Sequence, residues 1–326
     1  MNPNSIEKSG TDTEQQIEIS VVLPVLNEKD VIKDLHQELT KTLQSLHLHY
    51  EIIYVNDGSS DGSETILSEL AQEDTSVVLI NLTRNFGHQE AFSAGIDHAL
   101  GKAIILMDSD LQDHPNEIPK FIAAWKQGYQ VVYAIRRSRK AGPLMKLAYL
   151  CYYRVLGKLS DINIPVDAGD FCLMDRRVVD LLKSCPERTR FIRGLRSWVG
   201  LHQIGIEIDR NERAAGKPKY SFGKLILLAL NGIISFSNVP LRLISYLGIL
   251  CSLSSILLAI FYIVKKFTVG LNPPGFATIV VLVSFFAGLQ LVCLGVIGEY
   301  LARIYSEVKG RPTYLVKEII RKKISK

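Results

Sequence analysis

Short apolar runs alternate with segments of helical periodicity between residues 17 and 136. The apolar runs predict five strands, at Ile19–Val25, 51–56, Val77–Leu82, 103–108 and Val131–Arg136. This alternating order predicts an α/β fold with a mostly parallel sheet and helices on both faces. Ligands bind such sheets beyond the carboxyl ends of the strands. The loops that follow the strands are therefore the first place to look for chemistry.

The pattern changes after residue 220. In 221–241, apolar residues recur at helical spacing just before a long apolar stretch. This predicts an amphipathic helix in the membrane interface, with packing against the soluble domain as the alternative. Residues 243–264 and 276–298 then carry no charged side chain. At about 1.5 Å per residue, each can cross a hydrocarbon core roughly 30 Å thick, which predicts a transmembrane hairpin of two helices.

The two ends of the chain differ in charge. Residues 1–16 are polar and predict a disordered tail without a signal peptide. Basic residues are concentrated after the second apolar stretch, in 301–326. Because basic segments flanking membrane spans stay in the cytosol, we expect a multi-pass protein of the cell (inner) membrane. Its α/β domain, at 17–220, and both termini would be cytoplasmic.

Composition narrows the function classes. The 38 Lys and Arg residues against 33 Asp and Glu give a net charge of +5. No nucleic-acid-binding motif occurs, so we expect no nucleic acid partner. The five cysteines lack the paired spacing of a metal site and are typical of reduced thiols. Neither a glycine-rich dinucleotide turn nor a P-loop motif is present, so both of those nucleotide-binding classes lose their main support.

Three acids lie at or after the end of the fourth predicted strand, namely Asp108, Asp110 and Asp113. Residues two apart in an extended chain face the same side, so Asp108 and Asp110 would point together. Two carboxylates at a strand end can hold a hard divalent cation, and we predict Mg²⁺ or Mn²⁺. An acidic turn that caps the next helix is the alternative.

The loops after the earlier strands carry further polar residues. Asp57 could accept a hydrogen bond from a base or a ribose hydroxyl, whereas Asp61 and Ser63 are assigned to a turn and a helix cap. His88 is interpreted as a loop hydrogen-bonder because no partner histidine is near it in sequence. The candidates for binding a nucleotide sugar are Pro24, Asn27, Glu28, Asp57, Arg84 and Asp108.

These loops carry the motifs VVLPVLNE at 21–28, VNDGSSDGS at 55–63 and MDSDLQDHP at 107–115. In this order and spacing the sequence resembles the inverting glycosyltransferases of family 2, which have the GT-A fold. Within that family it looks most like the polyprenyl-phosphate glycosyltransferases, a group that includes bactoprenol glucosyltransferases and dolichyl-phosphate mannose synthases. The resemblance extends from about residue 19 to the C-terminus.

The resemblance implies a role for each acid. Asp57 would contact the nucleobase, Asp108 the ribose or sugar, and Asp110 the metal on the diphosphate. The segment GDFCLMDRR at 169–177 matches a further family motif and implies that Asp170 lies near the acceptor or the sugar. For Asp167 and Asp170, a glycine turn with capping acids is the alternative. Relatives also imply a homo-oligomer.

Cationic residues beyond the fourth loop are candidates for binding the acceptor and phosphates. Arginine suits bidentate phosphate contact, and lysine adds point charge. A solvated basic face beside anionic lipid is the alternative. In the family a loop at about 210–220 closes over the active site, and Ala215 and Pro218 depart from its usual pattern. The candidates are Arg136, Arg137, Arg139, Arg210, Arg213, Lys217 and Lys219.

The resulting expectation is metal-dependent, inverting transfer of a sugar from a nucleotide sugar, with UDP-glucose as the first choice, to undecaprenyl or another polyprenyl phosphate. The second pKa of such a phosphate is about 6, so the acceptor is already mostly charged and Asp113 need not act as a base. Another UDP-sugar or GDP-mannose is the alternative donor. A polysaccharide synthase and a non-catalytic nucleotide-sugar-binding membrane partner are the other classes considered. Two spans and the lack of a Q-x-x-R-W motif disfavour the synthase.

Overall fold

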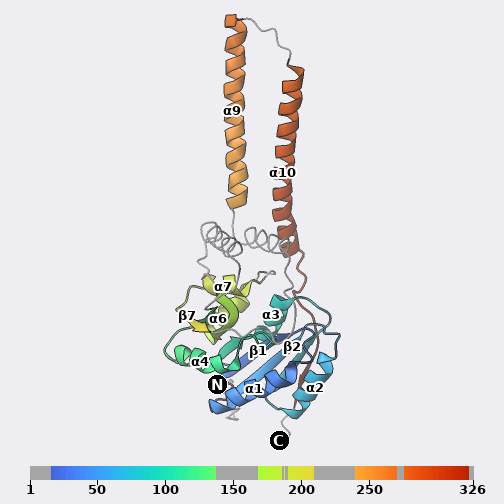
Figure 1. The fold of residues 1–326 in the computed structure, drawn as a ribbon, viewed down its shortest axis with the longest axis vertical. Coiled ribbons are helices and arrows are strands. Elements are labelled where there is room, and N and C mark those ends of the chain that lie inside the picture. The colour runs from blue at the N-terminus through green and yellow to red at the C-terminus, as the bar shows by residue number, and fades with distance from the viewer. Residues whose placement is uncertain are drawn as a thin grey trace, which may run out of the picture. The chain divides into compact units, whose positions relative to one another are not determined.

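The computed structural model describes residues 16–136, 168–185, 187, 190–208, 239–269 and 275–322 (Figure 1). They divide into two units. The described residues before 209 and after 311 form the first unit, and those from 239 to 311 form the second. The first unit holds the sheet, and the second holds two long helices.

The first unit alternates strands and helices as the hydrophobic pattern predicts. Its elements are β1 (Ile19–Val25), α1 (Ile32–Ser45), β2 (Tyr50–Asn56), α2 (Ser63–Glu73), β3 (Val77–Leu82), α3 (His88–His98), β4 (Ala103–Leu106), the 3₁₀ turn η1 (Pro115–Glu117), α4 (Ile118–Lys126), β5 (Val131–Arg136), β6 (Ala168–Asp175), α6 (Arg176–Ser184), α7 (Ile192–Trp198), β7 (Gln203–Ile208) and β8 (Val316–Arg321).

The strands form one sheet of eight, in the order β7-β5-β6-β4-β1-β2-β3-β8. The neighbours β4, β1, β2 and β3 are parallel. β6 runs antiparallel to both β4 and β5, and β8 runs antiparallel to β3, so these two strands oppose the rest. The prediction of a mostly parallel α/β sheet is confirmed.

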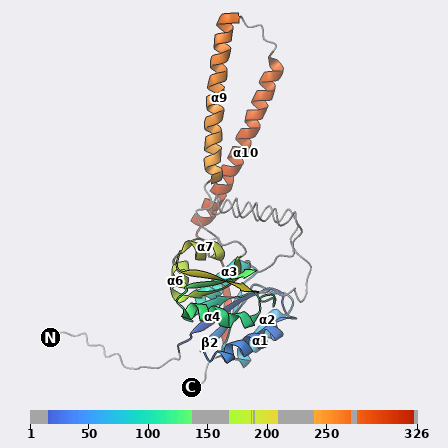
Figure 2. The same ribbon diagram turned by 60° about the vertical axis from the view of Figure 1, so that its left-hand side comes forward.

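Helices cover both faces of the sheet, and alternation along β1 shows why (Figure 2). Ile19, Val21, Leu23 and Val25 pack in one buried cluster with residues of α1, α2 and α4. Val22 points the other way, into a cluster with residues of α3, α6 and α7. Side chains alternate between the faces of a strand, so strands apolar on both faces need a helical layer on each side.

Strand boundaries differ from the prediction at the fourth strand. β4 ends at Leu106, not at Asp108. The amide of Met107 still donates to the carbonyl of Val22, at 3.1 Å, but the chain then leaves the sheet. Leu111 adopts a φ of 55°, in the left-handed region. Asp108 and Asp110 therefore lie on a loop, and strand alternation does not determine the directions of their side chains.

The C-terminal residues also differ from the prediction of a basic segment at 301–326. α10 continues to Val308, beyond the predicted end of the apolar stretch, and β8 then pairs with β3 along the sheet edge. Polar contacts support this pairing. Asn81 donates to Glu318 at 3.0 Å, and Arg321 contacts the buried carboxylate of Glu51 at 2.6 Å.

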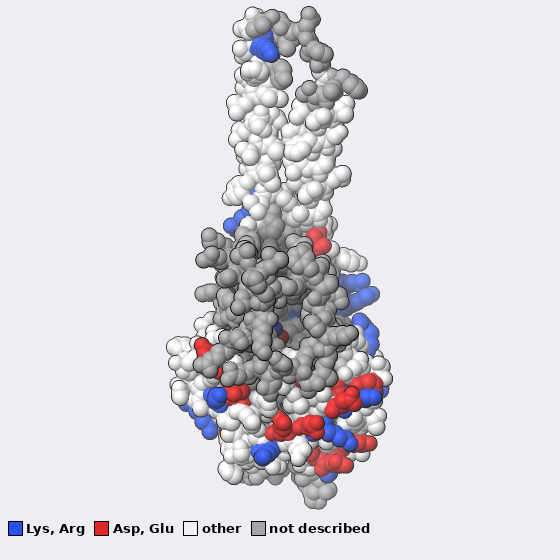
Figure 3. All heavy atoms as spheres, viewed as in Figure 1, with Lys and Arg blue, Asp and Glu red and all other residues white. Residues whose placement is uncertain are grey.

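The second unit consists of α9 (Val239–Val269) and α10 (Phe276–Val308), which include the predicted spans. Leu241–Lys265 and Ile279–Val308 each have a mean hydropathy of 2.5, and their most apolar windows bury nothing against the protein. Figure 3 shows the helices as uncharged surface along most of their length. Both helices are long and apolar enough to cross a membrane.

Several predictions fall on residues that the structure does not describe. They are the tail at 1–15, the residues Arg137, Arg139, Asp167, Arg210, Arg213, Ala215, Lys217, Pro218 and Lys219, and the proposed interfacial helix from 221 to 238. Arg136 is described as the last residue of β5.

Candidate active site

The loops after β1, β2, β3 and β4 lie at one edge of the sheet because these four neighbours are parallel. The antiparallel strand β6 brings a further acid, Asp170, to that edge. Its register against β4 runs from Ala103 opposite Asp175 to Leu106 opposite Cys172. Asp170 lies two residues before Cys172 on β6, and Asp108 lies two residues beyond Leu106, after β4 has ended. The two acids therefore lie near the same edge of the sheet although they are far apart in sequence.

The loops after β1 and β2 are tied to each other by short polar side chains. Asn27, with a φ of 57°, accepts the amide of Ser60 at 2.8 Å and donates its own amide to Ser59 at 3.1 Å. Asp61 accepts the amides of Lys29 and Ser63, and the hydroxyl of Ser63 accepts the amide of Glu28 at 3.1 Å. The geometry agrees with a turn role for Asp61 and shows Asn27 organising the loop.

Asp57 is almost fully buried, with 2% of its surface exposed. Its Oδ1 accepts the amide of Phe86 at 2.7 Å, and its Oδ2 accepts the amide of Gly87 at 3.0 Å. Burial raises the pKa of this carboxyl, and the two amides, with His88 and Arg84 nearby, offset that only in part. Asp57 thus fixes the backbone of the loop after β3.

Arg84 lies on that loop and is exposed. Its guanidinium stacks over the ring of Phe86, 4.1 Å from the centroid, and donates to the carbonyl of Asn85 at 2.9 Å. The stacking presents a cation beside the predicted nucleotide site.

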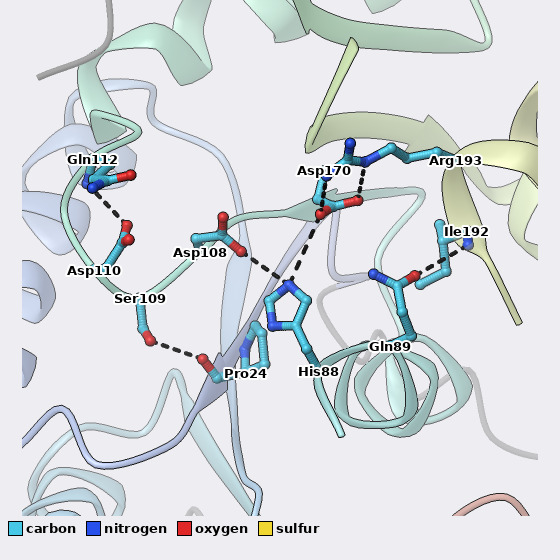
Figure 4. A network of polar contacts seen from close by, with 10 residues as sticks. All are labelled: Pro24, His88, Gln89, Asp108, Ser109, Asp110, Gln112, Asp170, Ile192 and Arg193. Carbon is cyan, nitrogen blue, oxygen red and sulfur yellow. Dashed lines mark hydrogen bonds and ion pairs between the residues drawn. The ribbon is translucent and has the colours of Figure 1, made fainter. Parts of the chain in front are cut away.

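Asp108 and Asp170 meet at an imidazole (Figure 4). His88 Nε2 lies 3.2 Å from Asp108 Oδ1 and 4.0 Å from Asp170 Oδ2. Burial lowers the pKa of His88, but the carboxylates of Asp108 and Asp170 outweigh it and raise the pKa above its ordinary value.

Asp170 also receives a bidentate contact from the guanidinium of Arg193, whose Nε and Nη2 each lie 2.6 Å from a carboxylate oxygen. Burial raises the pKa of Asp170, but Arg193 outweighs this and holds the pKa below its ordinary value. Asp170 is therefore an ionised carboxylate at neutral pH, held in a fixed orientation.

The acidic loop is held by a bond to a neighbouring strand, by a bond within the loop and by burial. The hydroxyl of Ser109 donates to the carbonyl of Pro24 at 2.8 Å, which joins the loop to the end of β1. Asp110 Oδ1 accepts the amide of Gln112 at 3.1 Å. Asp113 is buried, with 1% exposed. Figure 4 shows Asp108 directed toward His88 and Asp110 toward Gln112, so the two carboxylates have different partners.

Comparison with known proteins identifies the family. The model of glycosyl transferase family 2 matches residues 20–182. The chain belongs to glycosyltransferase family 2. An uncharacterized glycosyltransferase of Synechocystis sp. is 46% identical over 304 residues, which are 93% of this chain and 96% of the relative. The bactoprenol glucosyl transferase of Shigella phage SfII is 40% identical over 303 residues, 93% of this chain and 98% of the relative.

One similar solved structure is glucosyl-3-phosphoglycerate synthase from Mycobacterium tuberculosis in complex with Mn²⁺, UDP-glucose and phosphoglyceric acid. The similarity covers 67% of this chain and 78% of the synthase chain. The TM-score is 0.44 and the identity 21%. The family match and the relatives together make the chain a glycosyltransferase.

The described residues of this family 2 glycosyltransferase contain no group of three or more His, Cys, Asp or Glu side chains that could hold a metal by themselves. This does not conflict with the predicted cation. Mg²⁺ is usually bound through one or two carboxylates, with substrate phosphates and waters completing the shell. The oxygen donors of Asp110 and Asp108 fit such a site, in which the nucleotide diphosphate would supply further ligands.

Two residues of the candidate site were not among the predicted site residues. His88 was interpreted as a loop hydrogen-bonder, and it contacts two acids, one after β4 and one on β6. Arg193 was not considered at all. The crossover offered a signal for His88. α3 connects β3 to β4 and packs against β2 and β1, which lie between them. Because the helix starts directly after β3, its first residue lies at the same edge of the sheet where the parallel strand β4 ends.

Proposed function

We propose that this glycosyltransferase moves glucose from UDP-glucose onto the phosphate of undecaprenyl or another polyprenyl lipid, at the cytosolic face of the membrane, with a divalent cation. The match to bactoprenol glucosyl transferases carries this proposal, because it spans nearly the whole of both chains, apolar helices included. A soluble nucleotide sugar can diffuse to the α/β domain. A long isoprenoid phosphate stays in the bilayer, with its head group at the interface.

Chain connectivity supports an even number of membrane crossings. The chain leaves the sheet after β7, passes through α9 and α10, and returns to the sheet as β8. If both helices span the membrane, their outer ends must face the side that holds the sheet. Basic residues after the second helix favour the cytosol for that side, which would make a two-span protein with its catalytic domain in the cytoplasm.

The arrangement of acids suits the departure of a nucleoside diphosphate. Cleavage of the sugar–phosphate bond develops negative charge on the nucleotide. A divalent cation at Asp110 would supply the positive charge that neutralises it. Asp108 orients the donor from the end of β4, and Asp170 faces it from β6 with its orientation fixed by Arg193.

The burial of Asp113 supports transfer without a general base. A catalytic base must come within hydrogen-bond reach of the proton that it removes, and the side chain of Asp113 is enclosed. The acceptor phosphate, whose second pKa is about 6, is mostly dianionic at neutral pH. It can attack the anomeric carbon directly, and Asp113 then positions the acidic loop.

The direct test is a panel of radiolabelled nucleotide sugars, incubated with the detergent-solubilised full chain, undecaprenyl phosphate and either Mg²⁺ or Mn²⁺. We expect an organic-extractable, acid-labile glycolipid from UDP-glucose. Product from another UDP-sugar or from GDP-mannose would retain the lipid transferase and change the donor. No lipid-linked product from any donor would overturn the proposal. Sedimentation of the same preparation tests the predicted homo-oligomer.

A further inference from the structure

Two carboxylates of the candidate active site lie near one imidazole. Asp108 comes from the end of β4 and Asp170 from β6, and His88 Nε2 lies within 4.0 Å of both. The proposed substrates bring a diphosphate and a lipid phosphate to the same place. Like charges at such distances repel, so a donor between the acids determines how closely they approach.

The imidazole is held independently of the two acids. His88 is the first residue of α3, and the two amides immediately before it, those of Phe86 and Gly87, are fixed by Asp57. One turn later, the ring of Phe92 meets the imidazole edge to face, with the centroids 4.7 Å apart. The ring is about half exposed, and the backbone before it and Phe92 place it. It contacts Asp108 directly, whereas Asp170 is oriented by Arg193.

A second tie joins the same two regions. Gln89, the next residue of α3, accepts the amide of Ile192 at 3.2 Å, and Arg193 follows Ile192 on α7. α3 therefore contacts Asp108 directly and reaches Asp170 both directly and through α7 (Figure 4).

We propose that His88 is a positioning residue that sets the distance and orientation between Asp108 on the donor side and Asp170 on the acceptor side. The inference rests on the proposed function, since the two sides are defined by its two substrates. A displaced carboxylate leaves each substrate able to bind but misaligns the sugar and the attacking phosphate. The loss should therefore appear in kcat much more than in KM.

The test is steady-state kinetics on the full chain, with the donor that the wild type uses and undecaprenyl phosphate. His88→Ala should lower kcat by roughly 100-fold, the scale of a 1 Å misplacement, with KM for the donor within about threefold of wild type. His88→Gln places an amide N–H near the position of Nε2 and should restore kcat to within about tenfold of wild type.

The matched control is His36→Ala. His36 also contacts a carboxylate, with Nε2 3.6 Å from Asp74 Oδ2, but it lies on α1 and touches none of the site residues named above. It should leave kcat of the folded enzyme unchanged. If His88→Ala does not fold, His88→Asn replaces it, because asparagine is too short to reach Asp108, and it should be as slow as predicted for alanine.

Two results would overturn the inference. One is a kcat for His88→Ala, or for its asparagine substitute, within threefold of wild type. The other is equal loss in the short variant and in His88→Gln, since a role in holding Asp108 predicts rescue by the longer donor. Failure of the wild type to form any glycolipid overturns the proposed function and this inference with it, whereas an active wild type with an equally active His88→Ala overturns the inference alone.

Discussion

The loops after β2 and β4 start from the same pattern and end in different chemistry. In each, a buried parallel strand is followed by an acid at the edge of the sheet. Asp57 is enclosed, and both of its oxygens accept backbone amides. Asp108 and Asp110 are partly exposed, and Asp108 faces an imidazole whereas Asp110 accepts the amide of Gln112. An acid directly after a buried strand predicts a functional site at that edge. The pattern does not tell whether the acid holds the backbone of the site in place or binds the substrate.

The difference follows from what each loop contacts. The loop after β2 meets the loop after β3 so closely that Gly58 has no room for a side chain. The carboxylate of Asp57 therefore becomes the acceptor for the amides of its neighbour. The loop after β4 instead contacts His88 through Asp108 and the end of β1 through Ser109. The predictions below test this division, from the largest expected effect to the smallest.

The largest effect is expected at Asp110. Asp110→Asn keeps an oxygen for the amide of Gln112 but loses the charge that would hold a cation. Losing several kcal/mol of transition-state stabilisation lowers kcat/KM by roughly 10³-fold, at about 1.4 kcal/mol per factor of ten. Asp74→Asn is the matched control, because Asp74 Oδ1 accepts the amide of Ser76 in the same way, at 2.8 Å. Near-normal kcat/KM in Asp110→Asn would contradict a metal role.

Asp57→Ala should act on stability first. It leaves two amides, those of Phe86 and Gly87, without their acceptor. We expect a loss of about 3 kcal/mol, since each unsatisfied buried group costs roughly 1–3 kcal/mol. Thermal denaturation of the full chain measures it. An unchanged Tm with a raised KM for the nucleotide sugar would show that Asp57 acts only on the nucleobase, as the family resemblance implies.

Gly58→Ala tests the contact between the two loops. Gly58 has a φ of 72°, and a Cβ there would lie 2.6 Å from the amide nitrogen of Asn85. We expect a cost of about 2 kcal/mol, from strain and from displacement of the loop after β3. Gly62→Ala separates the two causes, because Gly62 also has a positive φ, 97°, but has nothing within 4 Å. Equal destabilisation by both variants would mean that backbone strain alone accounts for the cost, and that the close contact with the loop after β3 contributes nothing.

The smallest effect is expected for Ser109→Ala, which removes the bond from the acidic loop to the carbonyl of Pro24. The loss should be about 1 kcal/mol of stability, typical of one hydrogen bond. Ser68→Ala, which removes a bond within α2, is the control and should cost less. If the loss of activity, expressed as a free energy, is larger than the loss of stability, Ser109 also orients Asp108.

The parallel core was predictable because each of its strands is a short apolar run flanked by turn residues. β6 was harder to recognise, since glycine and acids flank its apolar residues and suggest a turn as readily as a strand. β8 was missed because an exposed edge strand carries charges and resembles a basic tail. Pairing between strands more than 200 residues apart leaves no local signal.

The part of the candidate site that follows the parallel core strands was predictable, because those strands were. Asp108 and Asp110 follow a strand along the chain, and the parallel order gives their edge of the sheet. That Asp108 and Asp170 lie near the same imidazole depends on the pairing of β6 beside β4. The place of His88 depends on the path of the α3 crossover. Both are properties of the assembled sheet, and no spacing in the sequence expresses them.

The most direct test of lipid-linked, metal-dependent glucosyl transfer is organic extraction of radiolabelled product. The full chain is reconstituted with UDP-glucose and undecaprenyl phosphate, with EDTA or with added Mg²⁺ or Mn²⁺, for wild type and Asp110→Asn. We predict labelled lipid only from the wild type with metal, and its loss on chelation. Absence of labelled lipid from the wild type with either metal, or equal labelling by Asp110→Asn in EDTA, would contradict the account.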